Sequence, residues 1–489
     1  HLSTLDTVNN LGNLYRIQGK LTEAEALYER ALKGHEEALG PEHASTLVTA
    51  NNLGALYKDQ GRVQEAEMMC VWALRGKEEV WGSKHTSTLD TVNNLAAIYT
   101  DQGRLHEAED MYQRALQGYE EALGLEHTST LTTVNSLGIL YADLGRFQDA
   151  QKMYSRALQG FEQAYGPKHT STLNAVNNLA TLQVNQGQMQ KAEELYVCAL
   201  QGYEEALGPQ HPSTLDIVNN LGNLYADKGK LAAAEKMYQR AQHGYEEALG
   251  VEHPSTLDAV NNLGILYADQ GKTTEAEGMY QRALQGCEKM FGTEHTSTLR
   301  IVGNLANLYR DQGKLAEAET MHQRALQGKG KALGPEHTST LDTVNNLGNL
   351  YRDQGKLAAA EAMYQRALQG REKALGLEHS STLQTVNNLG NLYRDQGKLA
   401  EAEAMYQRAL QGREKALGLE HTSTLQTVND LGNLYADQGK LAEAEAMYQR
   451  ALQVREKALG PEHLSTLDTV NNLGNLYRIQ GKLTEAEAT

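Results

Sequence analysis

The chain has 489 residues, a formal net charge of −17 and a sequence pI near 5.5. This acidic balance argues against nucleic acid or an anionic membrane as the main partner, because both favour basic surfaces. Neither an apolar run of 18 residues nor a charged-then-apolar leader occurs, so the sequence predicts no membrane span and a cytoplasmic location.

A period of 42 residues runs through the chain. Residues 1–26 recur letter for letter at 463–488, an offset of 462, which is 11 times 42. Such a period predicts a solenoid in which each unit packs on its neighbours, here one solenoid over residues 1–489. Because the chain begins without Met and ends partway through a unit, we expect a fragment of a longer protein. Eleven full repeats and a partial twelfth (463–489) begin at His1, His43, His85, His127, His169, His211, His253, His295, His337, His379, His421 and His463.

The first half of each repeat predicts a helix, here illustrated by repeat ten (379–420). Ser381 and Thr382 are N-cap candidates, because a hydroxyl can accept from the free N–H groups of a first helical turn. Apolar residues then recur at helical spacing from Leu383 to Leu392. Gly397 is predicted to end this helix in a turn with positive φ.

The second half of the repeat predicts a longer helix. Its apolar face runs from Leu399 to Leu417, and Gly418 closes it. Alanines at 402 and 409 would let the two helices approach closely. Because the alternation typical of strands is absent, the sequence predicts an all-α protein.

These residues carry a family resemblance. The order Leu389, Gly390 and Tyr393, then Gly397, Ala402, Tyr406 and Ala409, resembles the tetratricopeptide repeat. The resemblance implies a right-handed superhelix whose first helices line a concave groove for a protein or an extended peptide. The longer unit, with YRDQGK and REKALG, is similar to kinesin light chain and to the receptor ends of STAND-type NTPases. It implies the ligand-sensing repeats of a larger STAND/NLR-like receptor; a cargo adaptor and a purely structural spacer stay open as alternatives.

The sequence predicts no catalytic, metal or cofactor site. The recurring histidines cannot share one metal ion, because an intervening helix separates equivalent positions by more than metal–ligand bonds allow. The GlyLysThr at 271–273 lacks the earlier glycine of a phosphate loop, and the three cysteines form no CxxC pair. We therefore expect no catalysis, no metal and no cofactor.

A row of asparagines marks the predicted first helices. Asn is not favoured inside a helix, so something retains it there. Two interpretations stay open: a ladder of amides between neighbouring helices, and a row that binds the backbone of an extended ligand. The row contains Asn9, Asn51, Asn93, Asn135, Asn177, Asn219, Asn261, Asn345, Asn387, Asn429 and Asn471, with Gly303 as the exception.

Two variable positions share the helix face of that row, those of Asn13 and Arg16. In later repeats, Arg310, Arg352 and Arg394 occupy the second position, and Arg300 lies nearby. Guanidinium groups pair well with carboxylates, so the sequence predicts an acidic peptide as ligand.

Side chains at the end of the second helix suggest an apolar anchor site. Tyr119, Phe161, Tyr203 and Tyr245 occur there in repeats three to six, and arginines in repeats nine to eleven. We expect these side chains to reach the edge of the groove. Because both ends of the fragment carry the same unit, end-to-end self-association at high concentration is also expected.

Overall fold

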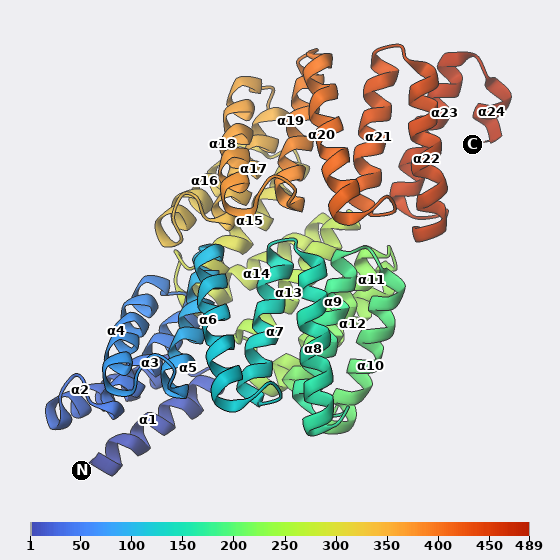
Figure 1. Ribbon diagram of the computed structural model, residues 1–489. Helices are drawn as coiled ribbons and strands as arrows, with labels where there is room; N and C mark the ends of the chain where they lie inside the picture. Colours follow the sequence, from blue (N-terminus) through green and yellow to red (C-terminus); the bar gives the residue numbers. More distant parts are fainter. Residues whose placement is uncertain (1, 489) are drawn as a thin grey trace. The chain divides into compact units, whose positions relative to one another are not determined.

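The computed structural model describes residues 2–488, in which helices follow one another in pairs (Figure 1). The first helices of the repeats are α1 (Leu2–Ile17), α3 (Ala44–Asp59), α5 (Thr86–Asp101), α7 (Thr128–Asp143), α9 (Thr170–Asn185), α11 (Pro212–Asp227), α13 (Pro254–Asp269), α15 (Thr296–Asp311), α17 (Thr338–Asp353), α19 (Ser380–Asp395), α21 (Thr422–Asp437) and α23 (Leu464–Gln480). The second helices are α2 (Leu21–Leu39), α4 (Val63–Trp81), α6 (Leu105–Leu123), α8 (Phe147–Tyr165), α10 (Met189–Leu207), α12 (Leu231–Leu249), α14 (Thr273–Phe291), α16 (Leu315–Ala332), α18 (Leu357–Leu375), α20 (Leu399–Leu417), α22 (Leu441–Leu459) and α24 (Leu483–Ala488). The described residues contain no strand, so the prediction of an all-α solenoid of helix pairs is confirmed.

The helices gather into two compact units. One contains the chain up to Val176 with Phe291–Thr296 and Lys331–Leu333, and the other contains the rest. Consecutive helices pack on each other within the units, as in α3 with α4, α4 with α5 and α11 with α12, as expected of a repeat array. The prediction of one solenoid over 1–489 stays a prediction.

The turn inside each repeat depends on a glycine, as predicted. Gly397 has φ of 73°, and the N–H of Lys398 reaches back to the carbonyl of Tyr393 at 2.8 Å. This hydrogen bond closes a helix C-terminus around a left-handed residue, which favours glycine. Gly418, with φ of 91°, ends α20 in the predicted place.

The predicted N-cap candidates, Ser381 and Thr382, are wrong, because the cap lies two residues before the first of them. The N-cap of α19 is His379, whose Nδ1 accepts from the N–H of Ser381 at 3.1 Å, and Thr382 instead donates to the carbonyl of Gly376. Nδ1 stands as many bonds from Cα as the Oδ1 of Asn, so a neutral imidazole can take the same capping role. The same contact occurs at His43, His85, His127, His169, His211, His253, His337, His421 and His463. His1 lies outside the described residues.

The core is built from small clusters between successive repeats. One cluster joins Ala402 and Tyr406 of α20 to Leu431 and Leu434 of α21, and all four side chains are buried. Equivalent clusters recur along the chain, with the same alanine, tyrosine and leucine positions. Each repeat therefore buries its apolar side chains against the next one.

Candidate functional site

The first helices form one layer of each unit. Successive first helices contact one another directly, although a second helix lies between them in sequence, as in α1 with α3 and α19 with α21. Because successive first helices contact one another directly, they lie closer together than an intervening helix would otherwise require. This close spacing places the layer of first helices on the inside of the local curvature. We call its surface, made by the positions of Asn9, Asn13, Arg16 and their equivalents, the inner face.

The asparagine row forms an amide ladder between neighbouring first helices. Nδ2 of Asn388 donates to Oδ1 of Asn345 at 3.1 Å, one repeat earlier. The same bond joins Asn52 to Asn9, Asn94 to Asn51, Asn220 to Asn177, Asn262 to Asn219, Asn304 to Asn261 and Asn472 to Asn429. Of the predicted residues, Asn9, Asn51, Asn261, Asn345, Asn387 and Asn429 are buried, Asn93, Asn135, Asn177 and Asn219 are partly buried, and Asn471 is exposed. These bonds account for asparagine in a helix, and a ligand-binding role for the row stays a proposal.

One rung of this ladder is reversed. Repeat eleven carries Asp430 where its neighbours carry Asn, and Asn387 donates to its carboxylate at 2.8 Å. A carboxylate cannot donate, so the amide of Asn387 must. Burial raises the pKa of Asp430, and hydrogen bonds from Asn387 and Gln426 oppose this shift.

We predict that Asp430→Asn stabilises the protein at pH 7 by about 1 kcal/mol, because it removes a partly desolvated charge and restores the amide rung. Urea unfolding of wild type and variant measures the difference. A carboxylic acid with a raised folded-state pKa destabilises the fold above that pKa, so the gain should shrink as the pH falls through the raised value. A variant less stable than wild type at pH 7 would contradict this account.

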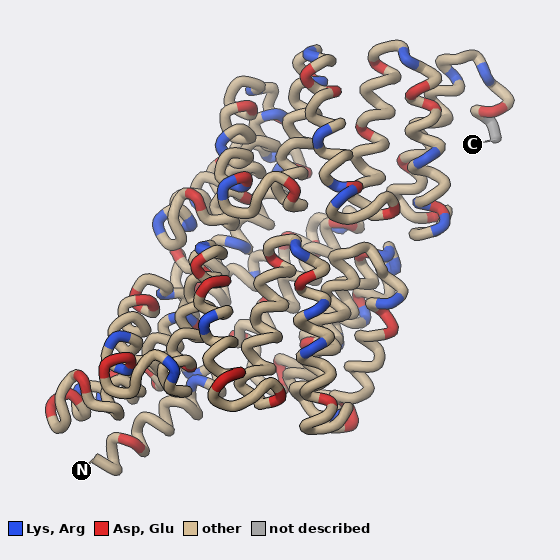
Figure 2. The backbone as a smooth tube through the Cα atoms, in the orientation of Figure 1, with Lys and Arg blue, Asp and Glu red and all other residues tan. Residues whose placement is uncertain are grey.

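The predicted basic strip is paired with aspartates in the structure. Arg352 Nε donates to Asp395 at 2.6 Å, and Arg394 pairs in the same way with Asp437, each aspartate lying on the next first helix. Arg310 contacts Asp311 at 2.8 Å and Asp353 at 3.6 Å, and Arg300 contacts Asp258. Figure 2 shows basic and acidic residues interspersed along the helices. The strip therefore carries far less net charge than its arginines alone suggest.

The sequence reasoning missed the aspartates that follow the arginine position. Nine repeats carry Asp there, whether or not a basic residue precedes it. In repeats six and seven alanines precede Asp227 and Asp269; burial, with the charge of the next aspartate as a smaller cause, raises the pKa of each carboxyl. Their charge is thus less offset than that of Asp395 and Asp437. The aspartate that recurs in nine repeats is the sequence signal that reveals these pairs.

The predicted aromatic anchors are core residues, so the expectation that they reach a groove edge is wrong in this structure. Tyr119, Phe161, Tyr203 and Tyr245 are only 2%, 4%, 1% and 3% exposed. Phe161 packs between Leu131 and Ala175, and Tyr245 packs in the equivalent cluster of repeats six and seven. The second helix is longer than the first, and its last turns extend beyond it. The first helix of the next repeat covers this overhanging end, which places these side chains between repeats.

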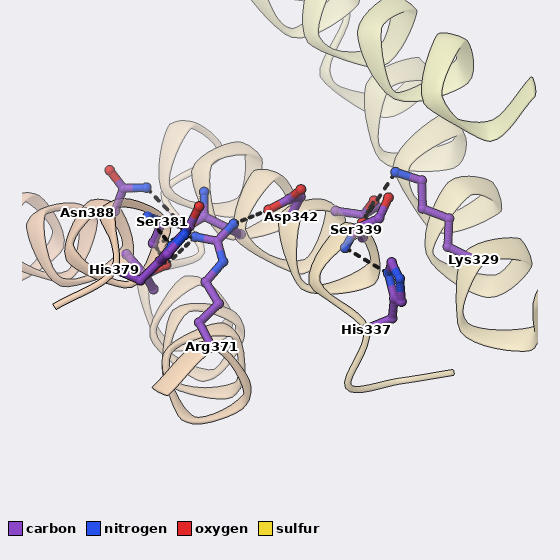
Figure 3. A network of polar contacts seen from close by, with 11 residues as sticks. Lys329, His337, Ser339, Asp342, Arg371, His379, Ser381 and Asn388 are labelled. Carbon is purple, nitrogen blue, oxygen red and sulfur yellow. Dashed lines mark hydrogen bonds and ion pairs between the residues drawn. The ribbon is translucent and has the colours of Figure 1, made fainter. Parts of the chain in front are cut away.

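Basic residues at the same position join three helices through hydrogen bonds. Nη1 of Arg371 donates to the carbonyl of Ser381 at 2.8 Å and to the hydroxyl of Thr385, and Nη2 pairs with Asp342 (Figure 3). Lys329, on α16, donates to the carbonyl of Ser339 at 3.3 Å. Arg413 and Arg455 repeat the arrangement of Arg371. These cations hold the array together and are not open to a ligand.

The inner face is open in the middle repeats, where small or apolar residues replace arginine. Ile139 and Ile265, at the position of Asn13, are 42% and 39% exposed. In the repeats of Tyr28, Tyr238, Tyr364, Tyr406 and Tyr448, by contrast, an asparagine at this position accepts from the tyrosine hydroxyl of its own second helix. The variable stripe therefore serves the fold in some repeats and is free for contact in others.

Two kinds of feature are absent from residues 2–488. No group of three or more His, Cys, Asp or Glu side chains there is arranged to hold a metal ion. None of the described helices combines the length and apolar character that a membrane crossing needs.

The geometry defines a helical-repeat scaffold with a polar inner face. The tetratricopeptide repeat model matches residues 3–79, 87–163, 134–205, 171–247, 215–289, 296–373, 339–415, 381–457 and 423–489, and the chain belongs to this family.

Three solved structures are similar to parts of the chain. Two are crystal structures of Podosopora anserina putative kinesin light chain nearly identical TPR-like repeats, one of them a point variant. Each is 26% identical to this chain and covers 42% of it. The match covers 97% of the variant's chain with a TM-score of 0.37, and 98% of the other chain with a TM-score of 0.36. The third, BtubC (BKLC) from P. vanneervenii, is 24% identical, covers 48% of this chain and 91% of its own, and has a TM-score of 0.37. No curated protein matches the chain.

Proposed function

We propose that the chain is a non-catalytic scaffold that binds a protein or an extended peptide along its inner face. Tetratricopeptide repeats generally mediate protein–protein interaction. The observation that carries the proposal is the pattern of the inner face, where the amide ladder is nearly constant and the adjoining positions of Asn13 and Arg16 vary between repeats. A fixed framework with a variable stripe is suited to recognition.

An acidic ligand remains part of the proposal, but it must compete with the ion pairs. Arg352 and Arg394 are each about one-third exposed, at 32% and 33%, so a carboxylate in solution can approach them. Asp395 and Asp437 already occupy the best hydrogen-bonding positions. The gain for an incoming carboxylate is therefore the difference between two similar ion pairs.

This competition predicts opposite effects for two matched variants. Asp395→Asn with Asp437→Asn should strengthen binding of acidic peptides by up to about fivefold per arginine released, corresponding to about 1 kcal/mol for an exposed pair. Arg352→Glu with Arg394→Glu should abolish that preference, and salt should weaken whatever binding remains. A displayed peptide library selected on wild type and both variants gives the comparison. If acidic peptides are enriched equally on all three proteins, the arginines do not take part in binding.

For the parent protein we propose a STAND/NLR-like receptor whose repeats sense the ligand, with a kinesin-light-chain-like cargo adaptor as the alternative. Support comes from the copy number and uniformity of the repeats, since repeats nine and ten differ at only three positions. Sequencing the gene upstream decides between them: a GxxxxGK[ST] motif favours the receptor, and a heptad coiled coil favours the adaptor.

End-to-end self-association is likewise a proposal. Leu14 and Ile17 of α1 are exposed, as are Leu464, Leu467 and Ile479 of α23. Exposed apolar side chains at both ends could bury each other in a second copy. Sedimentation over a range of concentrations tests this, and a constant monomer would remove the idea.

A further inference from the structure

Repeat eight contains a buried polar pair that lacks hydrogen bonds. His322 of α16 is 0% exposed, and neither ring nitrogen has a hydrogen-bonding partner; Oδ1 of Asn307 on α15 is also buried without one. Buried polar atoms without partners are rare and costly. Both residues lie inside helices, and this pair distinguishes repeat eight from its neighbours.

The comparison with other repeats shows what is missing. Where Asn occupies the position of Asn307, the second helix elsewhere supplies a tyrosine hydroxyl, as in Tyr364 to Asn349 at 2.7 Å. Repeat eight has His322 in place of that tyrosine, and Ala306 in place of the usual glycine. A Cβ on Gly348 would lie 2.6 Å from Cε1 of Tyr364, so an alanine there requires the tyrosine ring to shift. Repeat five accommodates this shift, because it carries Ala180 at the same position and the hydroxyl of Tyr196 still lies 2.9 Å from that of Thr181. The histidine, which has no phenolic hydroxyl, is therefore the substitution that removes the bond in repeat eight.

Other features of repeat eight weaken the same helices. Gly303 lies inside α15 and removes the side-chain acceptor that the asparagine row supplies to the next helix, and Gly330 lies in the last turn of α16. Nothing lies within 4 Å of an added Cβ at either glycine, so neither is required by close packing. Glycine in a helix interior favours the unfolded chain.

The surroundings of His322 oppose its protonation. The apolar cluster at this site contains Ala318, Leu347 and Leu350. Burial lowers the pKa of His322 to about 4, and the positive charges of Arg310 and Lys329 add to this shift. Two charged groups face His322, Arg310 of α15 and Lys329 of α16. Arg310 contacts Asp311 and Asp353. Lys329 is subject to the negative charge of Asp342 on α17 and the positive charge of Arg300 on α15.

We propose that repeat eight is a built-in point of local opening in the array, and that protonation of His322 promotes the opening of α15 and α16. The closed state holds the imidazole neutral among apolar side chains, whereas the opened state exposes it to water, where it accepts a proton readily. Acid thereby shifts the equilibrium towards a divided array.

The sign of the pH dependence follows from the direction of the shift. The closed-state pKa of His322 lies below the ordinary value of 6.5, so the opened state binds the proton first as the pH falls. The equilibrium constant for closing has its full value above about pH 6.5. It falls about tenfold for each pH unit between about pH 6.5 and about pH 4. At pH 5 the opening equilibrium should be about 30-fold larger than at pH 7.5.

Hydrogen exchange on the full chain tests the proposal. Peptides from α15 and α16 are compared with those from α17 and α18, after correction for intrinsic exchange at pH 7.5 and pH 5.0. We expect repeat eight to be less protected at pH 7.5 and the difference to widen about 30-fold at pH 5.0. Equal protection of the two repeats, or a difference that does not change with pH, would overturn the proposal.

Three variants separate its parts. Ala306→Gly with His322→Tyr should restore the tyrosine bond and remove the difference between repeats. His322→Gln should keep repeat eight weak but abolish the pH dependence, since an amide does not titrate in this range. Gly348→Ala with Tyr364→His should transfer the pH-dependent weakness to repeat nine. The proposal fails if the first pair leaves the difference intact, if the glutamine variant keeps the pH dependence, or if the transfer has no effect.

Discussion

Acidification from pH 7.5 to pH 5 is expected to destabilise the array at the starts of its first helices. At His253, His421 and His463 the imidazole Nδ1 accepts a capping hydrogen bond, which a protonated ring cannot do. Burial lowers the pKa of all three imidazoles. Arg413 near His421 and Arg455 near His463 lower it further. Asp216 and Asp258 around His253, and a hydrogen bond between His421 and the backbone of Asn185, oppose the shift.

The sign is the same at each of these caps. A folded-state pKa below the unfolded value means that stability is complete above about pH 6.5 and is lost as the pH falls through the range between the two values. A lost cap costs about 1 kcal/mol, so the three together should cost about 3 kcal/mol. Thermal unfolding at pH 7.5, 6.5 and 5.5 measures the loss.

Asparagine provides the matched control for these histidines, because it caps helices well and does not titrate. The triple variant His253→Asn, His421→Asn and His463→Asn should be close to wild type at pH 7.5 and lose less stability at pH 5.5. Identical pH profiles for wild type and variant would show that the caps are not responsible.

The second large effect is expected from Arg413, which is 1% exposed. Its guanidinium donates to Ser423, Thr427 and Gln384 at 2.7, 2.6 and 2.7 Å, and burial lowers its pKa to about 10. Arg413→Ala should destabilise the protein by about 3 kcal/mol, because it leaves a cavity and unpaired acceptors. Urea unfolding gives the magnitude.

The chain itself supplies the control for Arg413. Where an aromatic residue holds this position, different residues surround it: Tyr245 donates to Asp216 and packs on Ala259. Copying this set into repeats ten and eleven gives the triple variant Gln384→Asp, Arg413→Tyr and Thr427→Ala. It should recover most of the stability that Arg413→Ala loses. A triple variant as unstable as the alanine variant would show that the two solutions are not interchangeable.

The fold follows from the sequence because its signals are local. The 42-residue period, the helical spacing from Leu383 to Leu392 and the glycines at 397 and 418 each act within a few residues. Helix pairs and their boundaries were therefore predictable from one repeat. The capping error at Ser381 arose because hydroxyl groups are the commoner caps, whereas His379 fills that role here.

The site was harder to predict because its contacts join different repeats. The partner of Arg352, Asp395, lies 43 residues further on, so a single repeat does not show that the arginine is already paired. The end of the second helix resembles a groove edge in one repeat alone, because the helix that covers it belongs to the next repeat.

A signal for the second point exists in the sequence. The overhanging position is the one near the end of the second helix that His35 and Tyr119 occupy. Threonine follows 14 residues after its polar members (His35, Lys77, Lys329, Arg371, Arg413 and Arg455), and Ala or Ile follows Phe161, Tyr203, Tyr245 and Cys287; Tyr119, followed by Thr133, is the exception. Such paired change between repeats indicates contact, and comparing repeats in pairs would have revealed it.

The binding role of the inner face is the central claim, and photo-crosslinking tests it most directly. A peptide selected on the wild-type chain, carrying a photoreactive group at successive positions, is crosslinked to the full chain and the adducts are located by mass spectrometry. Our account predicts adducts on the first helices, at the positions of Asn13 and Arg16 and especially near Ile139 and Ile265, where the inner face is open. Adducts confined to the second helices or to the loops between repeats would contradict it.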